Sequence, residues 1–504
     1  MVADRETGPT ATSSITNTGS GPQSSNNGPG TQNVYQDISH NYSGVAGLFT
    51  VLKIPGEGAS HRAEGNFQRE RALSGTREGV LGMIHDWRKD RNPNVPICWV
   101  SGSLGVGKST IALTVATQCQ RDNELITSFL FDTRKRPLHP GKESATSVNP
   151  FALVLTIAED LQQKIPSLRD SIVKAVSNDP DFLSYAPEVQ FKVLILEPLL
   201  APEIWSNTNH PDLVIIDGMD EYKDQKIQER ILKVILSSYS KHPRFRLRFL
   251  ICSRPEPWIR NIFDRPAFSQ ITLKISLDDS KFSPESGIRR YYKHGFRGIC
   301  DRYKSCSVQF PERWPSKGDF DQLVRGSPTQ FLYASDVVAF VGPRDCQSAL
   351  NNPVKRLPFV TNSIPDLSKI NLPAEDRPFH RLDRRYKRVL EVAPRQPSQV
   401  LKTFRSVLAA IHFLPRVSDL QPSLALIELL LGLSNEVGIA LQATHSILDI
   451  RSRTDKIRVY HKSFGDFLSD ITRSGEFYIG KEHETLAHKW FQALFVDEAK
   501  LYTG

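Results

Sequence analysis

From residue 96 onwards, the hydrophobic residues fall into short runs separated by longer segments in which apolar positions recur with a helical period. The runs are rich in aliphatic residues and carry little charge. Strands that are buried on both faces of a mostly parallel sheet have this composition. The pattern therefore predicts an α/β fold class, with strands at 97–100, 126–131, 213–216, 249–252 and 271–275.

The second half of the chain has a mainly helical pattern. Residues 281–342 have helical periodicity, and a connection marked by Pro, Asn and Asp follows from 344 to about 376. Four amphipathic helices are predicted near 382–393, 399–413, 424–433 and 436–443. Segments 446–450 and 456–461 flank a polar turn and predict a β-hairpin, and a capping box from Ser463 to Asp466 predicts a helix over 463–470. Helices that end in a hairpin indicate a winged helix.

The beginning of the chain has a different composition. Residues 1–50 are rich in Ser, Thr, Asn and Gly and nearly free of large aliphatic residues, so they bury too little surface to offset the entropy lost on ordering. We predict a disordered, low-complexity tail there, with β-aggregation between chains as the alternative that its Asn and Gln content leaves open. Residues 51–95 are expected to form a linker and a helix leading into the sheet.

Length and charge narrow the class of protein only slightly. The 504 residues correspond to roughly three domains of about 150 residues each. No uncharged apolar stretch is long enough to predict a membrane span, and the first residues do not resemble a secretory signal, so we expect a cytoplasmic protein. The net charge of +9 permits an anionic partner but is modest for this length. Six scattered cysteines without a C-x-x-C pair predict reduced thiols rather than a zinc site or a disulfide framework.

The strongest chemical signal is a glycine-rich loop after the first predicted strand. Residues 102–109 read GSLGVGKS and match the pattern G-x-x-x-x-G-K-[ST], with a helical run behind them. Glycines let backbone N–H groups curl around phosphates, Lys108 reaches the outer phosphates, and Ser109 binds Mg²⁺. The loop therefore predicts a site for ATP or GTP with Mg²⁺. Its expected cofactor-binding residues are Gly102, Ser103, Leu104, Gly105, Val106, Gly107, Lys108, Ser109 and Thr110.

Two further predicted strands end in charged residues. Asp217 ends the run 213–216, and because ligands of open α/β sheets bind at the carboxyl ends of strands, Asp217 is the expected Mg²⁺ partner beside Ser109. Asp220 and Glu221 follow and are candidates to polarise the water that attacks a γ-phosphate, with a solvated acidic turn as the alternative. Arg254, after the run 249–252, is a candidate to stabilise γ-phosphate charge, with a structural ion pair as the alternative.

The segments VSGSLGVGKSTIA, LVIIDGMDE and FLICSRPE, in this order, resemble the NACHT domains of fungal STAND proteins, the NOD-like signalling ATPases. The flanking segments ALSGTREGVLGMIHDW and VYHKSFGDFLSD are similar to the same family, so the resemblance covers about residues 72–480. It implies a P-loop NTPase sheet with the ASCE, AAA+-like order, in which 249–252 lies between 97–100 and 213–216. The implied organisation is a NACHT domain at 96–278, a helical subdomain at 279–345, a linker at 346–376, a winged-helix domain at 377–480 and a C-terminal helix at 481–504.

The resemblance also implies roles for residues outside the three motifs. Thr76 and Arg77 match the segment that packs near the nucleotide base. Pro328, in Gly326-Ser-Pro328, matches a proline that lies against adenine. His461 matches the winged-helix histidine that contacts the β-phosphate of bound ADP and locks the inactive state.

The expected function is a nucleotide-dependent signalling switch. In this interpretation, MgATP or MgGTP favours an open homo-oligomer, slow hydrolysis gives the diphosphate, and the diphosphate holds the C-terminal domains closed. The resemblance places such a switch in fungal non-self recognition or programmed cell death, with a sensor or effector protein as an unidentified partner. Two alternatives stay open: a non-hydrolysing truncated adaptor or scaffold, and a nucleic-acid-binding ATPase that uses the winged helix. We do not expect nucleic acid as the partner, because the basic residues are spaced like ordinary solvated helix faces.

Overall fold

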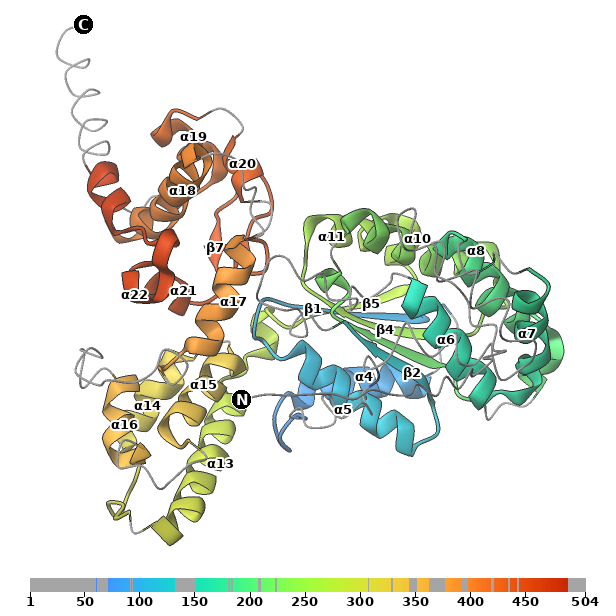
Figure 1. Ribbon diagram of the computed structural model, residues 1–504, viewed down its shortest axis with the longest axis horizontal. Helices are drawn as coiled ribbons and strands as arrows, with labels where there is room; N and C mark the ends of the chain where they lie inside the picture. Colours follow the sequence, from blue (N-terminus) through green and yellow to red (C-terminus); the bar gives the residue numbers. More distant parts are fainter. Residues whose placement is uncertain are drawn as a thin grey trace, which may run out of the picture. The chain divides into compact units, whose positions relative to one another are not determined.

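A five-stranded sheet forms the centre of the first half of the molecule (Figure 1). Its strand order is β2-β3-β4-β1-β5, and every pair of neighbours is parallel. The predicted α/β class with a parallel sheet is therefore confirmed, and β4 lies between β1 and β3 as the resemblance implied. The strands are β1 (Ile97–Ser101), β2 (Leu125–Leu130), β3 (Leu213–Asp217), β4 (Arg248–Ser253) and β5 (Thr272–Ser276).

The structure is a computed structural model, and it describes only part of the chain. The described residues are 60, 71–131, 151–361 and 377–487, with gaps at 91, 93, 180–181, 183–184, 207–209, 223, 307, 328–329, 344–350, 392–397, 418–420, 434–435 and 442–443. The predicted N-terminal tail, 1–50, lies outside these residues, and so does Pro328. None of the helices within the described ranges combines the length and apolar character that a bilayer crossing requires.

Each face of the sheet is covered by helices. On one face, Cys98 and Val100 of β1 pack with residues of α4 (Glu78–Asp90) and α5 (Lys108–Arg121). On the other face, Ile97 and Trp99 belong to a larger cluster with α6 (Phe151–Lys164), α10 (Gln225–Lys241) and α11 (Pro257–Phe263). The alternation along β1 follows from the two-residue period of a strand, and it explains why residues 97–100 of this strand are all apolar.

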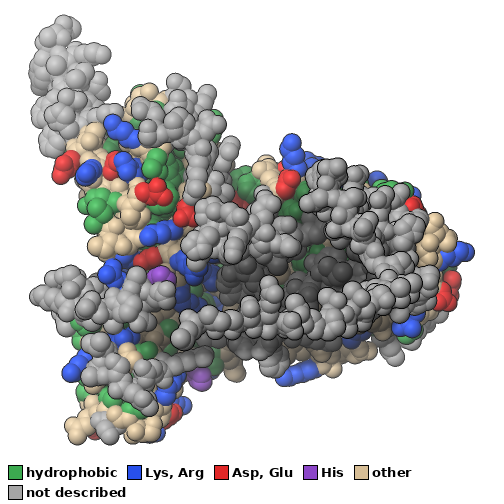
Figure 2. Space-filling model, viewed as in Figure 1, with side chains coloured by type: hydrophobic (Ala, Val, Ile, Leu, Met, Phe, Trp, Pro, Cys, Tyr) green, Lys and Arg blue, Asp and Glu red, His purple; other side chains and the backbone are tan. Residues whose placement is uncertain are grey.

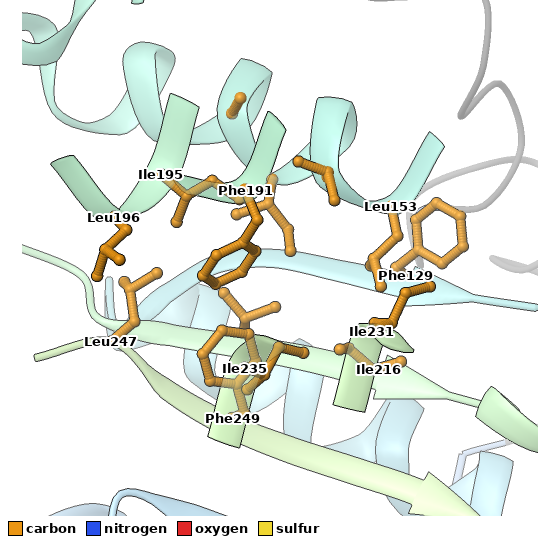
Figure 3. Packing of buried hydrophobic residues seen from close by; sticks show 14 of the residues in the cluster. Phe129, Leu153, Phe191, Ile195, Leu196, Ile216, Ile231, Ile235, Leu247 and Phe249 are labelled. Carbon is orange, nitrogen blue, oxygen red and sulfur yellow. The ribbon is translucent and has the colours of Figure 1, made fainter. Parts of the chain in front are cut away.

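Figure 3 shows the larger of these two clusters from close by. Phe129, Ile216 and Phe249 from the strands meet Phe191 and Ile235 from the helices. Burying a side chain of this size contributes about 1.5–3 kcal/mol, so the cluster fixes the sheet on which the site is built. The other elements of this half are η2 (Pro166–Leu168), α7 (Arg169–Ser177), α8 (Pro187–Phe191), the π-helical turn η4 (Lys192–Leu196), α9 (Glu197–Leu199), η5 (Pro202–Ser206), η6 (Met219–Glu221), α12 (Pro266–Ser269) and η7 (Ser280–Phe282).

The predicted helical region after the sheet consists of α13 (Glu285–Tyr303), η8 (Lys304–Cys306), α14 (Lys317–Gly326) and α15 (Phe331–Val341). Part of the segment predicted to be a connection is also a helix, α16 (Pro353–Val360). Its prolines read as breakers in the sequence, but Pro353 occupies the first turn, where no N–H is needed. The Asn352 side chain accepts hydrogen bonds from the N–H groups of Val354 and Lys355, which caps the helix.

The C-terminal part, which we define as the described residues from 377 to 487, is mostly helical. The predicted hairpin is present as the antiparallel pair β6 (Leu448–Asp449) and β7 (Arg458–Val459). The predicted capping box is wrong, because Ser463 is the first residue of its helix and its hydroxyl bonds to His461 and Tyr386 instead. The helices are α17 (His380–Glu391), α18 (Ser398–Val417), α19 (Leu424–Leu431), α20 (Glu436–Ala440), α21 (Ser463–Leu468), α22 (Ile471–Ser474) and η12 (Gly475–Phe477).

The cysteines differ in one respect from the prediction of six reduced thiols. Cys98, Cys119, Cys252 and Cys300 are free, but Cys306 is disulfide-bonded. Burial raises the pKa of the Cys252 and Cys119 thiols, which keeps them protonated and unreactive.

Candidate functional site

The glycine-rich loop connects β1 to α5 and has the backbone shape that an anion site requires. Gly105 and Gly107 have φ values of 78° and 105°, a conformation that other residues adopt only with strain. The Ile111 N–H is the first of α5 to bond, to the Gly107 carbonyl at 3.1 Å. Within the described ranges, no hydrogen bond takes any of the N–H groups of residues 105–110. These consecutive free donors, at the start of a helix, form a cradle for an anion.

Lys108 lies inside the loop rather than in solvent. Its ammonium group donates hydrogen bonds to the carbonyls of Gly102 at 2.7 Å and Ser103 at 2.9 Å. Burial lowers the pKa of Lys108, while Asp220, Asp278 and Asp217 oppose that lowering. The lysine is thus held beside the cradle by weak acceptors, from which an anion of higher charge can draw it away.

Asp217 and Ser109 meet at the carboxyl end of β3, as predicted. Asp217 is 2% exposed, its carboxylate accepts a hydrogen bond from the Ser109 hydroxyl, and its Oδ1 has no partner. Burial raises the pKa of Asp217 to about 6, and Glu221 and Asp220 add to the increase. A carboxylate oxygen without a partner beside a hydroxyl suits a hard divalent cation such as Mg²⁺.

Asp220, Glu221 and Arg254 form a charged group next to this position. The Asp220 carboxylate accepts the Arg254 backbone N–H at 2.8 Å and forms an ion pair with its guanidinium, Nε to Oδ2, at 3.2 Å. Glu221 is farther from the guanidinium, with 3.9 Å between Nη2 and Oε1, and its side chain is 28% exposed. The structure therefore brings together the three predicted catalytic residues, with Asp220 holding Arg254 and Glu221 facing more solvent.

Two carboxyl groups at this edge of the sheet escaped the sequence analysis. Glu256 is 5% exposed, its Oε2 has no partner, and burial raises its pKa to about 8. Asp278 follows β5 and accepts two hydrogen bonds from Ser103. The signal that found Asp217, an acid just beyond the carboxyl end of a strand, would have found Asp278 as well.

The residues ahead of α4 support the loop from outside. Arg77 donates to the carbonyl of Val106 at 2.8 Å and of Phe282 at 3.1 Å, and its guanidinium lies 5.1 Å from the centre of the Phe331 ring. Its φ of 56° is unusual for a residue with a side chain, and such strain often accompanies a functional position. Thr76 is buried and its hydroxyl donates to the Leu73 carbonyl at 2.6 Å. Arg77 therefore contacts the loop, and Thr76 precedes Arg77 in the chain; the proximity of both residues to a base stays a prediction.

His461 is buried in the C-terminal part. Its Nδ1 bonds to the Ser463 hydroxyl at 2.6 Å, and its ring centre lies 5.4 Å from that of Tyr333. Its Nε2 has no hydrogen-bond partner among the described residues. Burial lowers the pKa of His461 to about 4, Lys462 lowers it further, and the Gly326 backbone opposes the change. The imidazole is therefore neutral at pH 7, and its predicted phosphate contact stays a prediction.

The apex of the loop is bonded to segments far along the chain. The Leu104 N–H donates to the Ser446 carbonyl at 2.9 Å, and the Leu332 N–H donates to the Gly105 carbonyl at 3.2 Å. The Leu104 side chain belongs to the apolar cluster of the C-terminal part. The glycine at 105 is required here too, since a Cβ would lie 2.9 Å from the Leu332 Cβ.

A buried chain of side chains, which we call the polar relay, continues from this apex. Gln330 donates to the Leu104 carbonyl at 3.0 Å and to the Tyr386 hydroxyl at 3.4 Å. The Tyr386 hydroxyl bonds to the Ser463 hydroxyl at 2.9 Å, and Ser463 bonds to His461. The polar relay therefore joins the phosphate loop to His461 through α17 and α21.

One comparison with known proteins covers much of the first half of the chain. The family described as Nephrocystin 3, N-terminal matches residues 75–254, a range that contains the loop, Asp217 and Arg254. Among solved structures, a Walker-type ATPase of Pyrococcus abyssi is 13% identical, covers 78% of this chain and 96% of its own, and has a TM-score of 0.41. A comparison with curated proteins gives no match. The family match, the strand order and the loop together identify a P-loop NTPase fold.

Proposed function

We propose that the chain binds a nucleoside triphosphate, ATP or GTP, together with Mg²⁺. The observation that carries the proposal is the run of free N–H groups at residues 105–110, which has no acceptor among the described residues. Lys108 beside that run supplies a cation for the outer phosphates, and Ser109 and Asp217 supply oxygen ligands for the metal. Bound Mg²⁺ would neutralise charge on the phosphate oxygens.

Slow hydrolysis is the chemistry that the remaining charged residues support. Phosphoryl transfer needs mainly positioning and charge stabilisation. Glu221 is exposed enough to orient a water molecule, and Arg254 can stabilise charge on a γ-phosphate. Asp220 is engaged with the backbone and the guanidinium of Arg254, so its role in this proposal is to position that arginine.

The contacts at the loop apex support a switch rather than a simple hydrolase. A ligand that fills the loop acts on a backbone that is bonded to α15 and to the C-terminal part, so the two nucleotide states can favour different arrangements. The unpartnered Nε2 of His461 is available for a phosphate in the closed, diphosphate-bound state. We propose a cytoplasmic signalling ATPase of the NACHT-type STAND class that oligomerises in the triphosphate state. Fungal non-self recognition or cell death is its proposed setting, through a sensor or effector protein partner.

Nucleotide binding is tested by comparing the parent protein with Lys108→Ala in calorimetry with MgATP, MgADP and MgGTP. We expect Lys108→Ala to abolish binding, because the outer phosphates lose their cation. Lys304→Ala is the control, since Lys304 is exposed and forms an ion pair with Asp301. Equal affinity of the parent and Lys108→Ala would contradict the proposal.

Hydrolysis is tested with Glu221→Gln once binding is established. This variant should bind MgATP normally and hydrolyse it slowly. Hydrolysis at the parent rate would mean that another residue has the catalytic role.

A nucleic-acid-binding ATPase is the second candidate, and one surface favours it. Helix α13 exposes Arg290, Lys293, His294 and Arg297 along one face, and the next exposed residue on that face is the acid Asp301. Elsewhere, Figure 2 shows basic and acidic side chains close together on the described part of the visible face, which is typical of a solvated surface. Turnover measured with and without DNA or RNA at stated salt distinguishes the candidates. Stimulation would favour nucleic acid, and nucleotide binding without turnover would favour the scaffold alternative.

A further inference from the structure

Asp278 lies two residues beyond β5 and is bonded to the start of the phosphate loop. Its Oδ2 accepts the Ser103 backbone N–H at 2.8 Å, and its Oδ1 accepts the Ser103 hydroxyl at 2.7 Å. The preceding residue continues the pairing of the sheet, because the Leu277 N–H donates to the Ser101 carbonyl at 2.8 Å. Asp278 is therefore rigidly placed, and both of its oxygens are directed at one residue of the loop.

The bond to Ser103 extends to the lysine of the loop. The Ser103 carbonyl accepts the Lys108 ammonium at 2.9 Å, so Asp278 fixes the residue that in turn holds Lys108. Burial raises the pKa of the Asp278 carboxyl, and the positive charges of Lys108 and Arg77 oppose that increase. Asp278 thus supplies a negative charge behind a loop that gathers positive potential on its other side.

Asp278 differs from a metal ligand or a catalytic acid. Both of its oxygens have donors, whereas Asp217 has an oxygen without a partner. The Ser103 N–H points at Asp278 and is therefore not one of the free donors, which begin at residue 105. Asp278 consequently determines where the backbone leaves the sheet and starts to curl, before the cradle begins.

We propose that Asp278 is a positioning residue of the phosphate loop, which acts through Ser103 to hold the loop in the shape that receives phosphates. This inference rests on the proposed function and adds to it a residue that does not touch the nucleotide. Hydrogen bonds to a charged group are strong enough that losing them should weaken nucleotide binding about 10- to 100-fold. The loss should be similar for ATP and ADP, because the loop serves both.

A double-mutant cycle of MgADP and MgATP affinity, measured by calorimetry on the full chain, tests the proposal. Asp278→Ala and Ser103→Ala should each weaken binding, and the double variant should bind no more weakly than Asp278→Ala, since the Ser103 hydroxyl has already lost its acceptor when Asp278 is replaced. Asp278→Asn should lie between the parent and Asp278→Ala, because a carboxamide oxygen can still accept one of the two hydrogen bonds. Asp279→Ala is the matched control, as Asp279 is adjacent, its side chain is partly exposed, and its carboxylate accepts the Lys281 N–H and pairs with the Lys281 ammonium group.

The outcomes separate this inference from the proposed function. If the parent binds nucleotide and Asp278→Ala binds equally well, the inference is overturned while the proposed function stands. Additive losses in the cycle would also overturn it, because they would show that Asp278 acts by another route. If Asp278→Ala does not fold, Asp278→Asn with Ser103→Ala supplies the same cycle. A parent that binds no nucleotide overturns both.

Discussion

At the scale of single residues, burial of Asp217 favours its protonated form, whereas its proposed role as a Mg²⁺ ligand requires the carboxylate. Its pKa in the folded, ligand-free protein is raised from 3.8 to about 6 by burial, so the folded state binds a proton more tightly than the unfolded state. Stability contributed by this group is therefore present below pH 3.8 and is lost as the pH rises through about 6. At pH 7 the buried carboxylate destabilises the empty site.

We predict that Asp217→Asn makes the ligand-free protein more stable at pH 7 while weakening its binding of Mg²⁺ and nucleotide. The gain in free energy of unfolding should be about 1–3 kcal/mol, because an uncharged amide replaces a buried charge of similar shape. Urea unfolding of the nucleotide-free protein measures the first effect, and calorimetry with and without Mg²⁺ measures the second. A less stable variant would show that the carboxylate is satisfied in the empty protein.

Candidate site residues were predictable where a short sequence motif contains them. They were not predictable where only the fold brings distant residues together. A loop pattern and a strand end mark Lys108, Ser109 and Asp217 in the sequence, and the structure places them close together; their roles toward nucleotide and Mg²⁺ stay predictions. Asp278 contacts Ser103 across 175 positions of sequence, so no local pattern could pair them. A structural ion pair is the alternative that the sequence leaves open for Arg254, without naming its partner, and the structure pairs Arg254 with Asp220.

At the scale of elements, β1, β3 and β4 were predictable because each is buried along its length and contains an uninterrupted apolar run. Strand β2 includes Thr127 and Ser128 and β5 is only partly buried, but a short, mostly apolar segment marks each of them in the sequence. Helix α16 was missed because its prolines count against a helix in any sequence pattern, while its Asn352 cap and its packing are visible only in the fold. Ser463 was mistaken for a cap for a similar reason. Its hydroxyl has two tertiary partners, Tyr386 and His461, that compete with local capping.

The polar relay gives a prediction about contacts between elements. Tyr386→Phe removes only the hydroxyl that joins Gln330 to Ser463, so the bond between the loop apex and α21 is interrupted without a cavity. We expect a loss of about 1–2 kcal/mol in free energy of unfolding and faster release of bound MgADP. The release rate of a fluorescent ADP analogue measures the second effect.

Tyr292→Phe is the control for this experiment. Tyr292 is equally buried and bonds to the Ser327 hydroxyl at 2.7 Å, but it is not part of the polar relay. Its loss should lower stability by a similar amount and leave ADP release unchanged. Equal release rates for the two variants would mean that the relay contributes stability alone.

At the scale of the whole molecule, lowering the pH should change the stability of the two halves in opposite directions. Burial lowers the pKa of His445 and His461 from 6.5 to about 4, so the unfolded state binds protons more tightly and stability falls as the pH drops from 6.5 towards 4. Burial raises the pKa of Asp217 to about 6 and of Glu256 to about 8, so protonation of these groups stabilises the sheet region over the same range. The histidines belong to the C-terminal part and the carboxyls to the sheet region.

Calorimetric scans of the nucleotide-free protein should therefore show that the C-terminal part unfolds at a lower temperature at pH 5 than at pH 7. The expected loss is about 1–3 kcal/mol for each histidine. Limited proteolysis during the scan identifies which half opens, and His461→Gln should reduce the difference between the two pH values. Earlier opening of the sheet region at pH 5 would contradict the prediction.

The row of free N–H groups that starts at Gly105 also bears on how the protein is made. If a chain that binds nucleotide as proposed folds where nucleotide is present, the phosphates complete hydrogen bonds that the polypeptide leaves open. Ligand at one hundred times its Kd adds about 2.7 kcal/mol to the free energy of unfolding, a large share of a typical margin of about 5–15 kcal/mol. Nucleotide should therefore be present during expression and purification to keep the protein folded. The nucleotide-free protein is the form that chaperones and proteases encounter most often.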